Sequence, residues 1–72
     1  MKLCDIKKTG KYKILGVEDN ALYCKLRPYG FLIGSEIYVM MITKRMYIIK
    51  LFGSVYSINE SFAKLIEVSE DL

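Results

Sequence analysis

The chain alternates short apolar runs with polar turns, and most of these runs have the period of a strand. Residues 35–42 and 46–52 are β-branched, aromatic or aliphatic at most positions, and the polar segment Thr43-Lys44-Arg45 separates them as a hairpin turn would. Three further segments also read as short strands. They are residues 11–17, 55–58 and 66–68. The pattern therefore predicts a mainly β fold of about five short strands.

One segment has helical spacing instead. Apolar residues in 21–26 follow the acidic Glu18-Asp19-Asn20, which predicts a short helix with Asn20 as its N-cap. Pro28 lacks an amide donor and is predicted to end this helix, and Gly30 and Gly34 are expected to take the positive φ angles of the reversal into the next strand. Cys24 is expected to pack inside this corner. A single helical turn capped by Asn59 is predicted before the last strand.

These elements predict the fold class. Five short strands, tight hairpins, one short helix and a helical turn before the last strand are typical of a small, partly open barrel of the SH3-like type. An OB-type barrel is the alternative, and it ranks second because its strands are usually longer. We expect one domain over residues 1–72, because 72 residues make a single small core.

The composition excludes a disordered chain and gives no sign of export. The apolar content is 53%, with one proline and five glycines. The densest apolar stretch, residues 47–52, is interrupted by Lys50 and falls short of the roughly 18 residues of a membrane span. The N-terminus lacks the apolar region of a signal peptide. The sequence therefore predicts a cytoplasmic protein without membrane insertion.

The residue types argue against catalysis and against a dedicated metal site. The chain has no histidine, so neither a Ser/His nor a Cys/His nucleophile is available. Metal sites use histidine, thiolate or carboxylate ligands in sets of three or more, whereas this chain offers scattered acids and two distant cysteines, Cys4 and Cys24. We predict no enzyme and no cofactor, and reduced cysteines that are weak metal candidates at best.

The positive charge is concentrated near the N-terminus. Residues 1–13 hold five lysines against Asp5, and the whole chain has a formal net charge of +3. This group could meet phosphates or an acidic protein surface. Nucleic-acid binding would favour arginines beside aromatic platforms, and the sequence has only Arg27 and Arg45. We therefore expect no nucleic-acid partner.

The central hairpin has more apolar surface than folding requires. In residues 35–42 one face carries Ile37, Val39 and Met41, and the other carries Tyr38, Met40 and Ile42. Residues 46–52 repeat this two-sided pattern. A sheet needs only one apolar face to fold. The second face is either covered by the N-terminal segment and the helix or offered to a protein partner or to a second copy.

Several short motifs, taken in order, resemble those of a known family. The resemblance extends from Leu3 to Val68 and is carried by Leu3, Ile6 and Gly10; Ile14-Leu15-Gly16-Val17; Leu26, Gly30-Phe31, Gly34 and Ile37; Gly53; and Ala63, Ile66 and Val68. On these residues the chain resembles the FeoA family of ferrous iron transport, which is related to the C-terminal domain of iron-dependent repressors. It departs from the family pattern at Pro28-Tyr29, at Ile33 and in a shorter loop at residues 43–45.

The resemblance implies a bacterial cytoplasmic accessory module whose partner is the GTPase part of a FeoB-type ferrous iron permease. Transition-metal binding is implied by the family and not by these residues. The alternatives are a regulatory domain of an iron-dependent repressor or a metal-binding module. The residues predicted to meet the partner are Leu22, Leu26, Tyr29, Tyr38, Met40 and Tyr47, with Lys7, Lys8, Lys44 and Arg45 steering the encounter.

Overall fold

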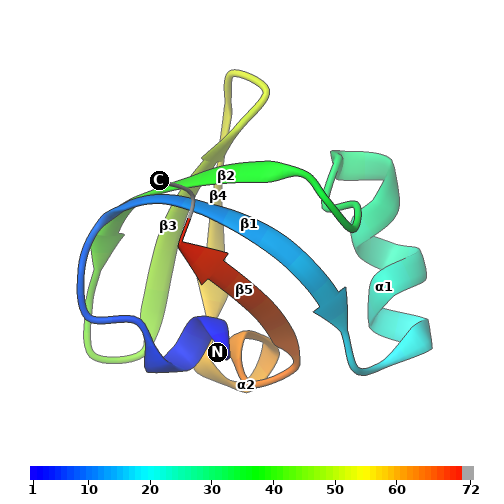
Figure 1. The fold of residues 1–72 in the computed structure, drawn as a ribbon, viewed down its shortest axis with the longest axis horizontal. Helices are drawn as coiled ribbons and strands as arrows, with labels where there is room; N and C mark the ends of the chain where they lie inside the picture. The colour runs from blue at the N-terminus through cyan, green and yellow to red at the C-terminus, as the bar shows by residue number, and fades with distance from the viewer. Residues whose placement is uncertain (71–72) are drawn as a thin grey trace.

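The computed structural model describes residues 1–70 and folds them into one antiparallel sheet of five strands (Figure 1). The order across the sheet is β4-β3-β2-β1-β5, so β4 and β5 are its edges. The strands are β1 (Gly10–Val17), β2 (Glu36–Ile42), β3 (Met46–Leu51), β4 (Ser54–Asn59) and β5 (Ile66–Glu70). The predicted mainly β, SH3-like fold is confirmed.

Short helical elements precede β1 and connect β1 to β2 and β4 to β5. They are η1 (Leu3–Asp5), α1 (Asn20–Leu26), η2 (Arg27–Tyr29) and α2 (Glu60–Ala63). Asn59 caps α2 as predicted, since its side chain accepts a hydrogen bond from the Phe62 amide at 3.0 Å. The predicted cap of α1 was wrong by one residue. Asp19 has the extended backbone of a cap and accepts from the Leu22 amide, whereas Asn20 is already helical.

The helical backbone after α1 extends past the point at which Pro28 was predicted to end it. The α-helix ends at Leu26, but the chain tightens into the 3-10 turn η2, which contains Pro28 near its start. A proline at the beginning of such a turn loses no hydrogen bond. Gly30, with φ 101°, ends the turn, and Gly34, with φ 92°, completes the reversal into β2, as predicted for these two glycines.

The core lies on the concave side of the curved sheet. It contains inward-facing residues of every strand together with residues of the helical elements, among them Leu3, Ile14, Phe31, Ile49 and Val68. Phe31 and Tyr56 pack edge to face with ring centroids 5.4 Å apart. Among residues 1–70, none of the helices is long and apolar enough to cross a membrane.

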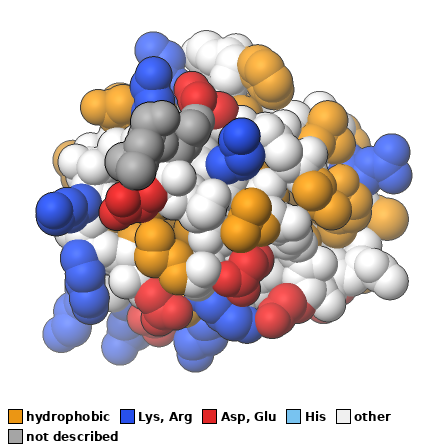
Figure 2. Space-filling model, in the orientation of Figure 1, with side chains coloured by type: hydrophobic (Ala, Val, Ile, Leu, Met, Phe, Trp, Pro, Cys, Tyr) orange, Lys and Arg blue, Asp and Glu red, His pale blue; other side chains and the backbone are white. Residues whose placement is uncertain are grey.

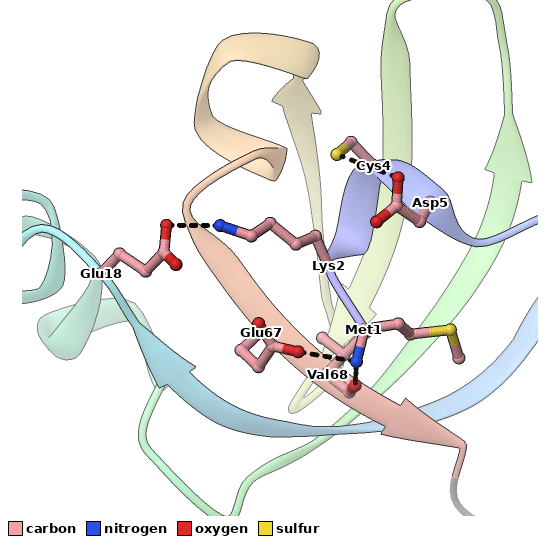
Figure 3. A network of polar contacts seen from close by, with 7 residues as sticks. All are labelled: Met1, Lys2, Cys4, Asp5, Glu18, Glu67 and Val68. Atoms are coloured by element: carbon pink, nitrogen blue, oxygen red, sulfur yellow. Dashed lines mark hydrogen bonds and ion pairs between the residues drawn. The ribbon is translucent and has the colours of Figure 1, made fainter.

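The N-terminal segment covers the β5 edge of the sheet (Figure 3). The Met1 ammonium donates to the Val68 carbonyl at 3.0 Å and pairs with a Glu67 carboxylate oxygen at 2.6 Å, while the Val68 amide donates to the Met1 carbonyl. Lys2 bridges to Glu67 through its backbone, and its ammonium binds Glu18 at 2.5 Å. The partnership with Glu18 raises the pKa of the Lys2 side chain.

Candidate functional site

The outer face of the sheet carries an uncovered apolar surface. Tyr38 of β2 lies opposite Lys50 of β3, and Lys50 lies opposite Val55 of β4. Tyr38 is 47% exposed and Val55 57% exposed, although Val39, next to Tyr38 on β2, and Ile49, next to Lys50 on β3, are fully buried. Folding therefore uses one apolar face of the hairpin and leaves the other in contact with solvent.

A bulge in β2 enlarges this surface. The register shifts between Val39, which pairs with Ile49, and Met41, which pairs with Ile48, so Met40 is an extra residue. A bulge breaks the in-and-out alternation of a strand. Met40 is 46% exposed and Met41 55% exposed, so two consecutive methionines point outward. The simple alternation assigned Met41 to the same face as Ile37 and Val39, and that assignment was wrong.

The β3–β4 hairpin ends in an exposed phenylalanine. Phe52 is 80% exposed and has φ 50°, a left-handed conformation that is strained for a bulky side chain. Its ring lies over Gly30, where a Cβ atom would come within 2.8 Å of two of its carbons. Sequence reasoning missed Phe52, Met41 and Val55. The sequence pattern placed Phe52 in the strand 46–52, whereas β3 ends at Leu51 and Phe52 lies with Gly53 in the hairpin turn.

Three residues predicted for the docking surface are buried in the core instead. Tyr47 is 5% exposed, and its hydroxyl donates to the Cys4 carbonyl at 3.1 Å. Desolvation raises the pKa of Tyr47. Leu22 and Leu26, one helical turn apart, are 7% and 9% exposed because they form the inward stripe of α1. As accessible contact residues these three were wrong, while Tyr38 and Met40 are exposed as the hypothesis requires.

The helix corner offers a separate exposed surface. Tyr29 is 56% exposed and packs edge to face on Tyr56, with ring centroids 5.6 Å apart. A shallow hollow beside it is lined by Cys24, Arg27, Pro28 and Leu32. Figure 2 shows hydrophobic side chains gathered on this side of the molecule, over α1 and the turn that follows it. Of the predicted corner residues, Tyr29 is the one that a partner can reach.

The predicted steering residues are all exposed. Lys7 and Lys8 follow η1, and Lys44 and Arg45 form the turn between β2 and β3. In Figure 2, lysine and arginine side chains gather toward the lower left, the side on which Figure 1 places the N-terminal segment and the β2–β3 turn. Basic charge therefore lies near one end of the hairpin whose outer face is apolar.

The cysteines do not form a joint site in this fold. Cys24 is exposed, and the expectation that it packs inside the corner was wrong, because it lies between Leu22 and Leu26 and faces away from their stripe. Cys4 is partly buried, which together with Asp5 raises the pKa of its thiol. Within residues 1–70 both are free thiols, and no three histidine, cysteine or carboxylate side chains lie close enough to hold a metal ion.

The family model that describes the FeoA domain matches residues 1–70. The chain belongs to the FeoA domain family. No curated protein sequence is significantly similar to this FeoA domain.

Solved structures of known proteins share the fold. The FeoA-like protein from Clostridium acetobutylicum is 25% identical with a TM-score of 0.84, and the match covers 100% of this chain and 87% of that protein. The FeoA protein from Chlorobium tepidum is 20% identical with a TM-score of 0.81, covering 94% and 68%. ScaR with bound Cd2+ is 23% identical with a TM-score of 0.88. That match covers 97% of this FeoA domain and only 35% of ScaR.

Proposed function

We propose that this FeoA domain is a non-catalytic cytoplasmic docking module that binds the GTPase part of a FeoB-type ferrous iron permease through the outer face of its central hairpin. The observation that supports this most directly is the uncovered apolar surface of Tyr38, Met40, Met41 and Val55. A small domain gains no stability by leaving four large apolar side chains about half exposed, and such patches are typical of protein interaction sites.

The chemistry of the surface suits protein recognition. Tyrosine and methionine are enriched at protein interfaces, and the flexible thioether side chain adapts to an irregular partner. Lys11 and Lys50 flank Tyr38 on the neighbouring strands, and the basic turn at Lys44-Arg45 lies at one end of the hairpin. These charges would attract a partner with an acidic rim and would accelerate the encounter at low salt.

The test is a titration of the ¹⁵N-labelled domain with the soluble GTPase domain of the permease, followed by amide chemical shifts. We expect shifts at residues 38–41, 48–50 and 55. Tyr38→Asp should weaken binding at least about tenfold, since it removes an exposed aromatic ring and places a carboxylate between Lys11 and Lys50, where it would neutralise the charges that attract an acidic partner. Phe62→Asp is the matched control. Phe62 is also an exposed aromatic residue, 44% exposed, but lies on α2 at the end of the barrel.

Two results would contradict the proposal. One is equal loss of binding in Tyr38→Asp and Phe62→Asp with both variants folded, which would place the contact elsewhere. The other is a silent titration with the GTPase domain and saturable shifts near Cys4 or Cys24 on anaerobic addition of Fe2+. That result would favour a metal-binding module over a docking module.

A further inference from the structure

The two edge strands of the sheet, β5 and β4, differ in whether another segment of the chain pairs with their outer side. The N-terminal segment pairs with the β5 edge through the hydrogen bonds between Met1 and Val68. At the other edge, β4 pairs with β3 on one side, and no other segment within residues 1–70 pairs with its second side. Four of its six residues are exposed. An exposed edge is a template for a further strand.

The hairpin turn determines which β4 groups face outward. Leu51 and Ser54 pair directly across the two-residue turn, in which Phe52 and Gly53 both have positive φ, as in a type I′ turn. The residues that close such a turn bond to each other, and the direction of the backbone groups then alternates. The amide and carbonyl of Val55 and Ser57, and the amide of Asn59, therefore point away from β3.

The sequence of β4 lacks the usual protection of an edge strand. Natural edges carry lysines, prolines or inward-pointing charges that prevent pairing. Residues 54–59 read Ser-Val-Tyr-Ser-Ile-Asn and contain no charge and no proline. The β2 bulge at Met40 lies two strands away and does not interrupt this edge.

We propose that β4 pairs antiparallel with β4 of a second copy of this chain, across a two-fold axis at Ser57, so that the two sheets become continuous. In this register the two Ser57 residues exchange both backbone hydrogen bonds, and each Asn59 amide donates to the Val55 carbonyl of the other copy. Each strand presents the outward groups that the other requires, which is the self-complementarity of a two-fold interface.

Charge favours this pairing over a parallel or shifted one. Lys50 lies beside Val55 at one end of β4, and Glu60 follows Asn59 at the other end. The two-fold axis places Glu60 of one copy near Lys50 of the other, and no like charges oppose each other along the strand. The contact is smaller than the roughly 1,200–2,000 Å² of stable interfaces, so we expect a weak dimer that depends on protein concentration.

Disulfide trapping tests the register directly. In a Cys24→Ser background, Ser57→Cys places two thiols on residues that oppose each other at about 5.5 Å between Cα atoms, within the range of a disulfide. Ser54→Cys is the matched control, on the same exposed strand. Its two copies would lie six residues apart along the paired strands, about 20 Å. We expect oxidation to cross-link the first variant and not the second, and equal cross-linking of both would overturn the proposal.

A measurement on the unmodified chain complements the trapping. Raising the protein concentration should slow hydrogen exchange at the Ser57 and Asn59 amides while leaving the already bonded Tyr56 and Ile58 amides unchanged. Ser57→Lys should weaken dimerisation about tenfold or more in analytical ultracentrifugation, because like charges would oppose each other. A monomer at the highest concentration would overturn the proposal. So would a dimer without protection at Ser57, since its contact would lie on another surface such as the apolar outer face.

Discussion

The two faces of the β2–β3 hairpin have similar apolar residues and opposite roles. On the inner face Ile37, Val39 and Ile49 are at most 1% exposed and form the centre of the core. On the outer face Tyr38, Met40 and Met41 are between 46% and 55% exposed. Hydrophobicity along the strand does not distinguish the two sets. The difference comes from what the rest of the chain covers, since Phe31, the α1 stripe and the α2 turn all pack on the inner side.

This contrast separates the residues that fold the domain from those available to a partner. The inner face tolerates little change because each side chain there is enclosed by others. The outer face can vary at small cost to stability, so substitutions on it report on binding.

The largest expected effect comes from one position on the inner face. Ile49→Ala should lower the free energy of unfolding by about 2–5 kcal/mol, because it opens a cavity at a fully buried site. A domain of this size has only about 3–5 kcal/mol in total, so this loss would remove a large part of its stability. Ile48→Ala is the matched control, since Ile48 is the half-buried neighbour on the outer face. Urea titrations of both variants that gave equal losses would contradict the division.

Tyr47 is an inner-face residue with a polar tip, and its removal should have an intermediate effect. Tyr47→Phe should cost about 0.5–1.5 kcal/mol at pH 7, because the Cys4 carbonyl loses its hydroxyl donor. Tyr38→Phe on the outer face should change stability by a few tenths of a kcal/mol at most. A loss in Tyr38→Phe as large as that in Tyr47→Phe would show that the outer tyrosine also supports the fold.

Tyr47 should also affect how the stability of the domain changes at alkaline pH. Desolvation raises the pKa of Tyr47 above its unfolded value of 10.0, so the folded state holds this proton more tightly. The associated stability is complete below pH 10 and is lost as the pH rises through the folded-state pKa. Tyr47→Phe should therefore show a shallower alkaline loss in urea titrations. Some loss should remain, because burial also raises the pKa of Tyr12.

The strands and helical turns could be predicted from the sequence, but the side chains exposed on the outer face could not. Period, turn glycines and the Asn59 cap located all five strands and α2, because these signals are local. The exposed surface depends on the bulge at Met40 and on the orientation of α1, and neither has a local signal. For this reason Met41 was assigned to the inner face, and Leu22, Leu26 and Tyr47 were assigned to the docking surface although they are buried.

Phe52, at the tip of the β3–β4 hairpin, is a further exposed apolar residue, and its backbone conformation is strained. Phe52→Asn should raise the free energy of unfolding by about 0.5–1 kcal/mol, because asparagine tolerates positive φ and Asn-Gly is favoured in type I′ turns. Phe52→Leu keeps the strain and should not stabilise. Thermal unfolding of the two variants would measure this. If Phe52→Asn destabilises the domain, the ring contributes more by packing over Gly30 than it costs in strain.

The smallest expected effect is on the outer face itself. Met41→Gln preserves length and flexibility while removing apolar surface, and it should change the free energy of unfolding by less than about 0.5 kcal/mol in urea titrations. Val39→Gln is the inner-face counterpart two residues away, and it should unfold the domain because it buries an amide among apolar groups. A loss above about 1 kcal/mol in Met41→Gln, present at high protein concentration and absent at low, would mean that a second copy covers the outer face. The face would then belong to self-association and would no longer be free for another protein.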